Sequence, residues 1–418
     1  MRCFLTQYRN SAGSGLDTLV PFCSRSMMPP VLHLRDGLPP RSLIIALLAL
    51  PQIAETILAP ALPDLALHWR LDTGAAQAVM GVFFLGFAAG VLLWGHLADA
   101  WGRRPALLGG LAVGMAGTLC ALFAPRFDAL LLGRFIQALG LATCSVTTQT
   151  LLRDRLQGEP LTRYFVTLGA VLAWSPAVGP LAGQLVSDRL GYQGVLATIA
   201  LAIWLALLAG AARLRETRGE AAKRVALPAL ARQMLGDRTL RCAAVLVAGL
   251  NLLVFSFYSA GPFLTGPLPG LGFGWIGLAV ALAGSLGALF NARLPVSAGP
   301  ARRVAYGLRC VLLGVAAQAA AILLDPTPGP LWALAALPLF AGYGLAIPNL
   351  LGPALKHYGH SLGRAGALFG VAYYSLLGLG LAATSWLPFG SPLPLSLAWL
   401  AVTAILMAVH RAQRRGQG

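Results

Sequence analysis

Residues 95–107 read Gly-His-Leu-Ala-Asp-Ala-Trp-Gly-Arg-Arg-Pro-Ala-Leu and separate two long apolar runs, at 75–95 and 104–123. Each run has about the 20 apolar residues that a membrane-spanning helix needs. The two glycines of the stretch permit a tight turn, its aspartate can interact with a helix N-terminus, and its two arginines suit the aqueous face of a membrane. This stretch therefore predicts a short turn between two transmembrane helices.

Apolar runs of this kind recur outward along the whole chain of 418 residues, which is 57% hydrophobic and 11% charged. A water-soluble domain has about a quarter charged residues, so the composition indicates a polytopic membrane protein. The runs lack the alternating ten-residue segments of a transmembrane β-barrel. We expect an all-α membrane protein with twelve transmembrane helices, near 42–61, 75–95, 104–123, 128–151, 162–186, 192–212, 241–263, 273–292, 304–324, 330–352, 362–384 and 392–410.

The basic residues set the expected direction of these spans. Of 31 Lys and Arg residues, 26 lie in the even-numbered connections and the two tails. Cytoplasmic loops are enriched in such residues, so we expect both termini in the cytoplasm. The net charge of +17 then reflects membrane topology and not a nucleic-acid partner. The preference for Arg over Lys, with abundant Ala, Leu and Gly, is typical of a GC-rich bacterial genome, which suggests a multi-pass protein of the bacterial inner membrane.

A basic connection divides the chain into two sets of six spans, the layout of transporters built from two six-helix halves. Residues 1–41 lack the apolar core of a secretory signal, and Met27 or Met28 is an alternative start. The six Cys residues form no CxxC pair, which disfavours zinc and haem sites. The expected divisions are a cytoplasmic tail at 1–41, an N-terminal half at 42–212, a cytoplasmic connection at 213–241, a C-terminal half at 242–410 and a tail at 411–418.

One acidic side chain, Glu55, lies well within a predicted span. An ionisable group at membrane depth is costly and by default indicates function. Arg134 lies about six residues, or roughly 9 Å, from the same membrane face as Glu55, so the two can sit at similar depth. A nearby Arg favours the charged carboxylate whereas burial favours its protonated form, and this balance suggests a proton-responsive switch. A static ion pair joining the two helices is the alternative.

Polar and aromatic side chains inside the other spans suggest a substrate cavity. A cavity lined in this way suits amphipathic organic compounds through stacking and hydrogen bonding. For any single ring, packing or contact with lipid is the alternative. The predicted cavity residues are Gln52, Asn251, Phe255, Tyr258, Tyr343, Asn349 and Tyr373.

The stretch at 95–107 resembles the loop between helices 2 and 3 of the major facilitator superfamily, and its position in a predicted cytoplasmic connection agrees. The resemblance implies the major facilitator fold and a role for the loop in latching the two halves at the cytoplasmic face. Ala100 departs from the family pattern, in which a basic residue is usual. The residues to which this gating role is carried over are Gly95, Asp99, Gly102, Arg103 and Arg104.

Two further motifs narrow the resemblance. Arg134-Phe-Ile-Gln137 resembles the RxxqGxg motif of helix 4, and Gly179-Pro180-Leu-Ala-Gly183 resembles the GPxxGG motif associated with drug:proton antiporters. Gln184 replaces the last glycine of the second motif. The segment from Gln52 to Asp64, together with Ser259-Ala-Gly-Pro-Phe263, is similar to the Bcr/CflA (EmrD-like) group of that branch. The resemblance implies that Glu55 carries the proton, tuned by Arg134 and Gln137.

These observations predict a proton-coupled antiporter that exports small organic compounds, in the manner of multidrug-resistance efflux proteins. A proton symporter importing a nutrient or metabolite on the same fold is the alternative. We expect no enzymatic activity, since no P-loop, nucleophile elbow or metal-ligand cluster occurs and the connections are too short for a catalytic domain. We also expect no cofactor or metal, the proton gradient as the energy source, and a monomer whose partners are a small organic substrate, protons and the lipid bilayer.

Overall fold

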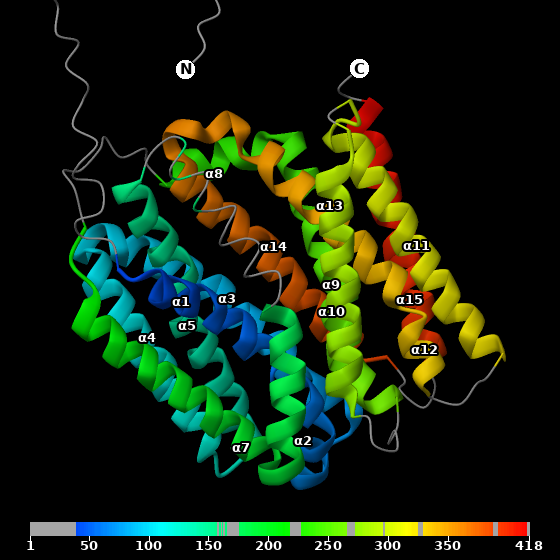
Figure 1. Cartoon of the computed structure of the whole chain (residues 1–418), viewed down its shortest axis with the longest axis horizontal. Helices are drawn as coiled ribbons and strands as arrows, with labels where there is room; N and C mark the ends of the chain where they lie inside the picture. Colours follow the sequence, from blue (N-terminus) through cyan, green and yellow to red (C-terminus); the bar gives the residue numbers. More distant parts are fainter. Residues whose placement is uncertain are drawn as a thin grey trace, which may run out of the picture. The chain divides into compact units, whose positions relative to one another are not determined.

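The structure is a computed structural model that describes residues 39–156, 175–217, 227–265, 272–295, 297–324, 329–387 and 392–415, with the single residues 159, 161 and 164. They belong to one compact unit, Gly37–Gly418, whereas Met1–Asp36 forms a separate unit outside the described residues. The described residues form helices and no strands (Figure 1). The helices are α1 (Arg41–Thr56), α2 (Leu62–Trp69), α3 (Thr73–Trp101), α4 (Arg103–Leu122), α5 (Phe127–Arg155), α7 (Ser175–Arg213), α8 (Leu227–Gly236), α9 (Arg238–Leu264), α10 (Phe273–Arg293), α11 (Pro300–Leu324), α12 (Pro330–Leu334), α13 (Leu337–Ala354), α14 (Leu362–Thr384) and α15 (Leu393–Arg415), with 3-10 turns at Ala59–Ala61 and Lys356–Ser361.

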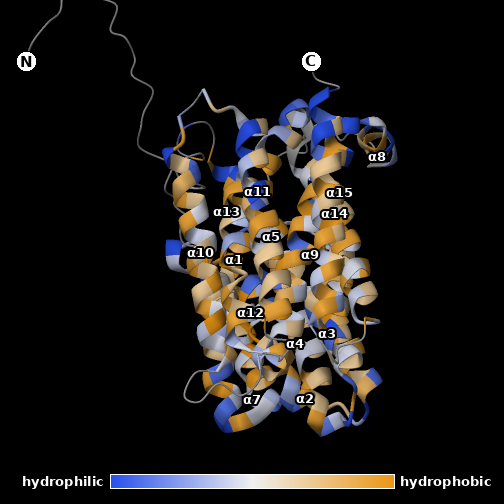
Figure 2. Ribbon diagram, turned by 90° about the vertical axis from the view of Figure 1, so that its right-hand side faces the viewer, coloured by the Kyte–Doolittle hydropathy of each residue, from blue (hydrophilic) through white to orange (hydrophobic). Residues whose placement is uncertain are grey.

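Within the described residues, eleven helical segments are long and apolar enough to cross a membrane. Figure 2 shows hydrophobic residues along the middle of these helices and hydrophilic ones concentrated at their ends. The predicted spans at 75–95, 104–123 and 128–151 coincide with α3, α4 and α5 to within a few residues. The all-helical membrane architecture is confirmed, while the number of twelve spans stays a prediction.

Several boundaries differ from the prediction. The span at 42–61 is not one helix, because α1 ends at Thr56 and a 3-10 turn at Ala59–Ala61, which contains Pro60 without an N–H donor, leads into α2. The span at 330–352 is divided between α12 and α13. The first part of the span at 162–186 lies outside the described residues. The predicted connection at 213–241 also contains a helix, α8.

The long helix α7 changes direction at Gly191, whose φ of 63° lies in the left-handed region. Asp64, in the first turn of α2, accepts the backbone N–H of Tyr192 at 2.7 Å. A Cβ atom at position 191 would lie only 2.9 Å from the same carboxylate. Gly191 and Asp64 together therefore form the tight turn at which the predicted spans 162–186 and 192–212 meet.

The core consists mainly of two large hydrophobic clusters. One is drawn from α1 to α7, and the other mainly from α8 to α15. Glycines permit close helix contacts within each set: a Cβ atom at Gly140 of α5 would lie 2.5 Å from the Cα of Gly114 in α4, and one at Gly307 of α11 would lie 2.7 Å from the carbonyl oxygen of Gly342 in α13. Two separately packed sets of helices thus flank the space in which the candidate site lies.

Candidate functional site

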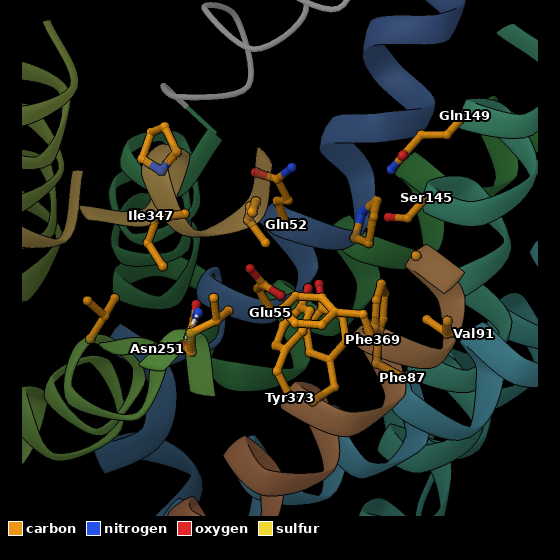
Figure 3. Close-up of a pocket in the computed structure, with 18 of the residues that line it drawn as sticks. Gln52, Glu55, Phe87, Val91, Ser145, Gln149, Asn251, Ile347, Phe369 and Tyr373 are labelled. Atoms are coloured by element: carbon orange, nitrogen blue, oxygen red, sulfur yellow. Dashed lines mark hydrogen bonds between the residues drawn. The ribbon is translucent and has the colours of Figure 1, made fainter. Parts of the chain in front are cut away.

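A cavity of about 640 Å³ lies between the two sets of helices. Its walls come from α1, α3 and α5 on one side and from α9, α10, α13 and α14 on the other (Figure 3). It extends to Arg153 near the end of α5 and to Gly363 near the start of α14. The volume falls within the range of pockets that enclose small organic molecules.

Contacts between the two sets of helices join the opposite end. The Ser259 hydroxyl on α9 donates to Oε1 of Gln77 on α3 at 3.2 Å. The Gly274 N–H at the start of α10 donates to Oε1 of Gln184 on α7 at 3.3 Å. The cavity extends away from these two contacts, toward the end of α5 at Arg153 and the start of α14 at Gly363.

The structure brings most of the predicted cavity residues together. Glu55 lines the cavity, and Figure 3 shows its carboxylate above the tyrosine rings. Glu55 is also the only Asp or Glu among the described residues that line this space. The predicted residues that line the same cavity are Gln52, Asn251, Phe255, Tyr258, Tyr343 and Tyr373.

Aromatic rings from three helices fill the floor of the cavity. Tyr374 of α14 contacts Phe87 of α3 edge-on, with ring centroids 4.8 Å apart, and lies 4.1 Å from Tyr373. Phe84 of α3 in turn packs against Phe255 of α9 at 4.5 Å. These rings present an apolar, polarisable surface on which an aromatic substrate can stack.

Asn349, the remaining predicted cavity residue, is not among the described residues that line this cavity. Its Nδ2 donates to Oδ1 of Asn291 and to the carbonyl oxygen of Leu345, both at 2.8 Å. Asn349 therefore uses its amide to join α13 to the end of α10 and does not face the cavity. Tyr343 on the same helix does face it, and its hydroxyl donates to Oδ1 of Asn251 at 3.0 Å.

Arg134 is fully buried next to α1 but does not line the cavity. Its guanidinium group lies over the ring of Phe83, 4.6 Å from the centroid, and donates to Gln137 and, at 3.4 Å, to the carbonyl oxygen of Ala54. Among the described residues, no ion pair joins Arg134 to Glu55. Arg134 thus contacts the backbone one residue before Glu55, and the alternative of a static ion pair does not describe this state.

The loop at 95–107 forms an ionic network at one end of the helices. Gly102, with φ of 107°, ends α3, and Arg103 then pairs with Asp99 at 3.0 Å and with Asp154 of α5 at 2.8 Å. Asp99 also pairs with Arg364 of α14 at 3.3 Å, which joins the two sets of helices directly. The predicted latching residues therefore lie together, and Arg364 is a partner that the sequence did not reveal.

Glu216, which follows α7, is a second such partner. Its carboxylate accepts the backbone N–H groups of Arg103 at 2.9 Å and of Arg104 at 3.1 Å. A negative charge on the exposed N–H groups at a helix start stabilises that helix, here α4. Of the predicted loop residues, Gly95 is the one outside this network; it packs near Val146 of α5.

The glycine motif of α7 packs against α1 immediately after Glu55. A Cβ atom at Gly179 would overlap the Thr56 hydroxyl, and one at Gly183 would overlap the carbonyl oxygen of Ile57. On its other side, Pro180 contacts α10, since a Cβ atom at Gly277 would lie 2.5 Å from the Pro180 Cβ. The motif therefore sets the separation between the helix that carries Glu55 and the second set of helices.

Sequence reasoning missed one wall of the cavity. Ser145 and Gln149 of α5 face this space, together with Thr150 and Arg153. Their spacing of four residues places Ser145, Gln149 and Arg153 on one helix face, which was the available signal. In the described part of the chain, no cluster of three or more His, Cys, Asp or Glu side chains could hold a metal ion.

A cavity between two sets of membrane-spanning helices is typical of a transporter. The chain belongs to the Major Facilitator Superfamily, whose family model matches residues 44–383. It is 29% identical over 382 residues to a chloramphenicol resistance protein of Pseudomonas aeruginosa, covering 86% of this chain and 88% of that protein. It is 27% identical to an uncharacterized transporter of Rickettsia bellii (81% of this chain, 87% of the relative) and 27% identical to multidrug resistance protein D of Escherichia coli K12 (55% and 58%).

The fold is similar to a solved structure as well. A crystal structure described as an auto-inhibited POT family peptide transporter matches 89% of this chain and 95% of its own, with a TM-score of 0.70 and 14% identity. At this level of identity the likeness shows the shared fold alone.

Proposed function

We propose that this protein is a proton-coupled antiporter that exports small organic compounds by alternating access. The observation that carries the proposal is the position of Glu55, the one carboxylate among the described residues that line a cavity whose other lining residues, apart from Arg153, are uncharged. A carboxylate at this depth is costly unless it has a task, and reversible protonation is the task open to it. The names of two relatives, a chloramphenicol resistance protein and a multidrug resistance protein, support export of drug-like compounds.

In the proposed cycle, Glu55 takes a proton from the outside, and substrate from the cytoplasm displaces that proton. Arg134 holds the backbone at Ala54, and Gln137 holds Arg134 while donating to Thr118 at 2.7 Å. Glu55 follows Ala54 directly in α1, and the Ala54 carbonyl oxygen accepts from Arg134 of α5. Protonation of Glu55 therefore changes the charge next to this contact between α1 and α5. Rocking of two six-helix halves, twelve spans in all, then exposes the cavity to either side in turn.

We also propose an orientation and a location for the protein in the membrane. With both termini in the cytoplasm, the network of Asp99, Arg103 and Arg364 lies at the cytoplasmic face, and the described state directs its cavity toward that face. The protein acts as a monomer in the bacterial inner membrane and uses the proton gradient. The glycine motif at Gly179 favours the drug:proton branch, and the segments Gln52–Asp64 and Ser259–Phe263 favour the Bcr/CflA group within it.

Reconstituted vesicles provide the test. Vesicles with a pH-sensitive dye inside receive a chloramphenicol gradient, with wild-type protein and with Glu55→Gln. Antiport predicts proton movement opposite to chloramphenicol, above the rate in protein-free vesicles and lost in the variant. Movement of protons and chloramphenicol in the same direction would instead establish the symporter, and coupling that persists in Glu55→Gln would remove Glu55 from the mechanism.

A further inference from the structure

The cavity has a wall of neutral hydrogen-bonding groups without partners among the described residues. Gln52 on α1 and Ser145 and Gln149 on α5 all line it, and Figure 3 shows their polar ends projecting into the same space above Glu55. Gln52 lies three residues before Glu55, which places both on one face of α1. In the described part of the chain, no hydrogen bond engages these three side-chain polar groups.

A second observation on the opposite wall also indicates a ligand. The Tyr258 side chain of α9 lines the cavity and is only 1% exposed, yet its hydroxyl group has no hydrogen-bond partner in the part of the chain that the structure describes. A buried polar atom without a partner carries a desolvation cost that a bound molecule can remove. Unpartnered donors and acceptors therefore face the same enclosed space from both sets of helices.

We infer that Gln52, Ser145 and Gln149 form a subsite that recognises an uncharged amide or hydroxyl group of the substrate. This inference rests on the proposed function and specifies the substrate class of the transporter. The expected substrates are uncharged aromatic compounds that carry several amide or hydroxyl groups. The aromatic ring stacks near Tyr373 and Phe87, and the polar group reaches the amides. A Gln side chain offers two donors and an acceptor, which match an amide or diol.

The chemistry of the subsite discriminates against permanent organic cations. A cation bound here would leave the amide donors facing an apolar surface, and a site built to hydrogen-bond a substrate rejects molecules that leave its polar groups unpaired. Uncharged compounds that carry amide or hydroxyl groups can pair with these amides.

Binding to the purified full-length protein tests the inference without involving protons. The probes are chloramphenicol, which is uncharged with an aromatic ring, an amide and two hydroxyl groups, and ethidium, an aromatic cation. Gln52→Leu and Gln149→Leu are each expected to weaken chloramphenicol binding about fivefold, the value of one hydrogen bond of typical strength. Ser145→Ala is a milder change, expected to weaken it roughly threefold on the same scale.

Gln233→Leu, on the exposed face of α8, is the matched control and should bind chloramphenicol like the wild type. The inference is overturned if the wild type binds no chloramphenicol, if it binds ethidium more tightly, or if the cavity variants bind chloramphenicol as the control does. Loss of amide-dependent binding and loss of proton coupling are separate results. Amide-dependent binding without coupled proton movement would refute the antiport mechanism and leave the subsite standing.

Discussion

Replacing Gly183 by alanine should disturb the contact between α7 and α1 on which the site depends. The added Cβ atom would overlap the carbonyl oxygen of Ile57 and lie 2.9 Å from its carbonyl carbon and 3.1 Å from Cγ of Pro60. Comfortable carbon contacts begin near 3.5 Å, so the helices must separate by roughly 0.6 Å for the carbonyl carbon alone. Inserting a group into packing this tight costs about 1–3 kcal/mol.

Gly109→Ala on α4 is the matched control. A Cβ atom there would lie 3.6 Å from the nearest atoms of Trp94, an ordinary contact. Both substitutions gain the same intrinsic helix preference of alanine, about 1 kcal/mol. The difference between the two variants therefore isolates the overlap, and we expect Gly183→Ala to be less stable by about 1–3 kcal/mol.

Reversible unfolding in mixed micelles, followed by tryptophan fluorescence, measures this difference. Transport by the same two variants shows whether the shift of α1 also displaces Glu55. Equal unfolding free energies and equal transport rates for Gly183→Ala and Gly109→Ala would refute the argument that this glycine is required by the helix contact.

Three further predictions concern the ends of the helices. Asp64→Ala removes the acceptor of the Tyr192 N–H and should lower the unfolding free energy by about 1 kcal/mol, measured in the same unfolding assay; no change would mean that the turn at α7 does not need this acceptor. Glu216→Ala removes the acceptor of two N–H groups at the start of α4 and should raise the rate of amide hydrogen exchange in the first turn of that helix, whereas unchanged exchange would show that water replaces the carboxylate without loss. Arg364→Gln breaks the pair with Asp99 between the two sets of helices. Since both side chains are partly exposed, the substitution should change the unfolding free energy by less than about 1 kcal/mol. It should broaden the distance distribution between spin labels on α3 and α14, and an unchanged distribution would exclude the pair as a latch.

The long apolar runs predict most of the helices, because a helix that spans the bilayer needs about 20 apolar residues whichever helices surround it. The breaks were harder to place. Pro60 and Gly191 were visible in the sequence, but the turn at Gly191 depends on the carboxylate of Asp64, which is distant in the chain. Hydropathy alone contains no information on that contact.

The cavity was predicted in part for a similar reason. Glu55 was recognisable because a lone acid in an apolar run is rare, and the aromatic side chains near it share its cavity. Asn349 pairs with Asn291 of another helix, a contact that the sequence does not indicate. The sequence does not indicate Glu216 as a partner of the loop, because it lies among the arginines of a basic connection. It does not indicate Gln149 as a cavity residue either, because the direction of a polar side chain on α5 is known only once the facing helices are known.

The number of protons released when substrate binds to purified protein tests directly whether Glu55 exchanges its proton for substrate. Chloramphenicol is added to wild-type protein and to Glu55→Gln in weakly buffered detergent solution containing a pH indicator. Antiport at a shared carboxylate predicts proton release by the wild type, close to one proton per bound substrate, and none by the variant. Binding of chloramphenicol to the wild type without proton release, or equal release by Glu55→Gln, would contradict the central claim that Glu55 exchanges its proton for substrate.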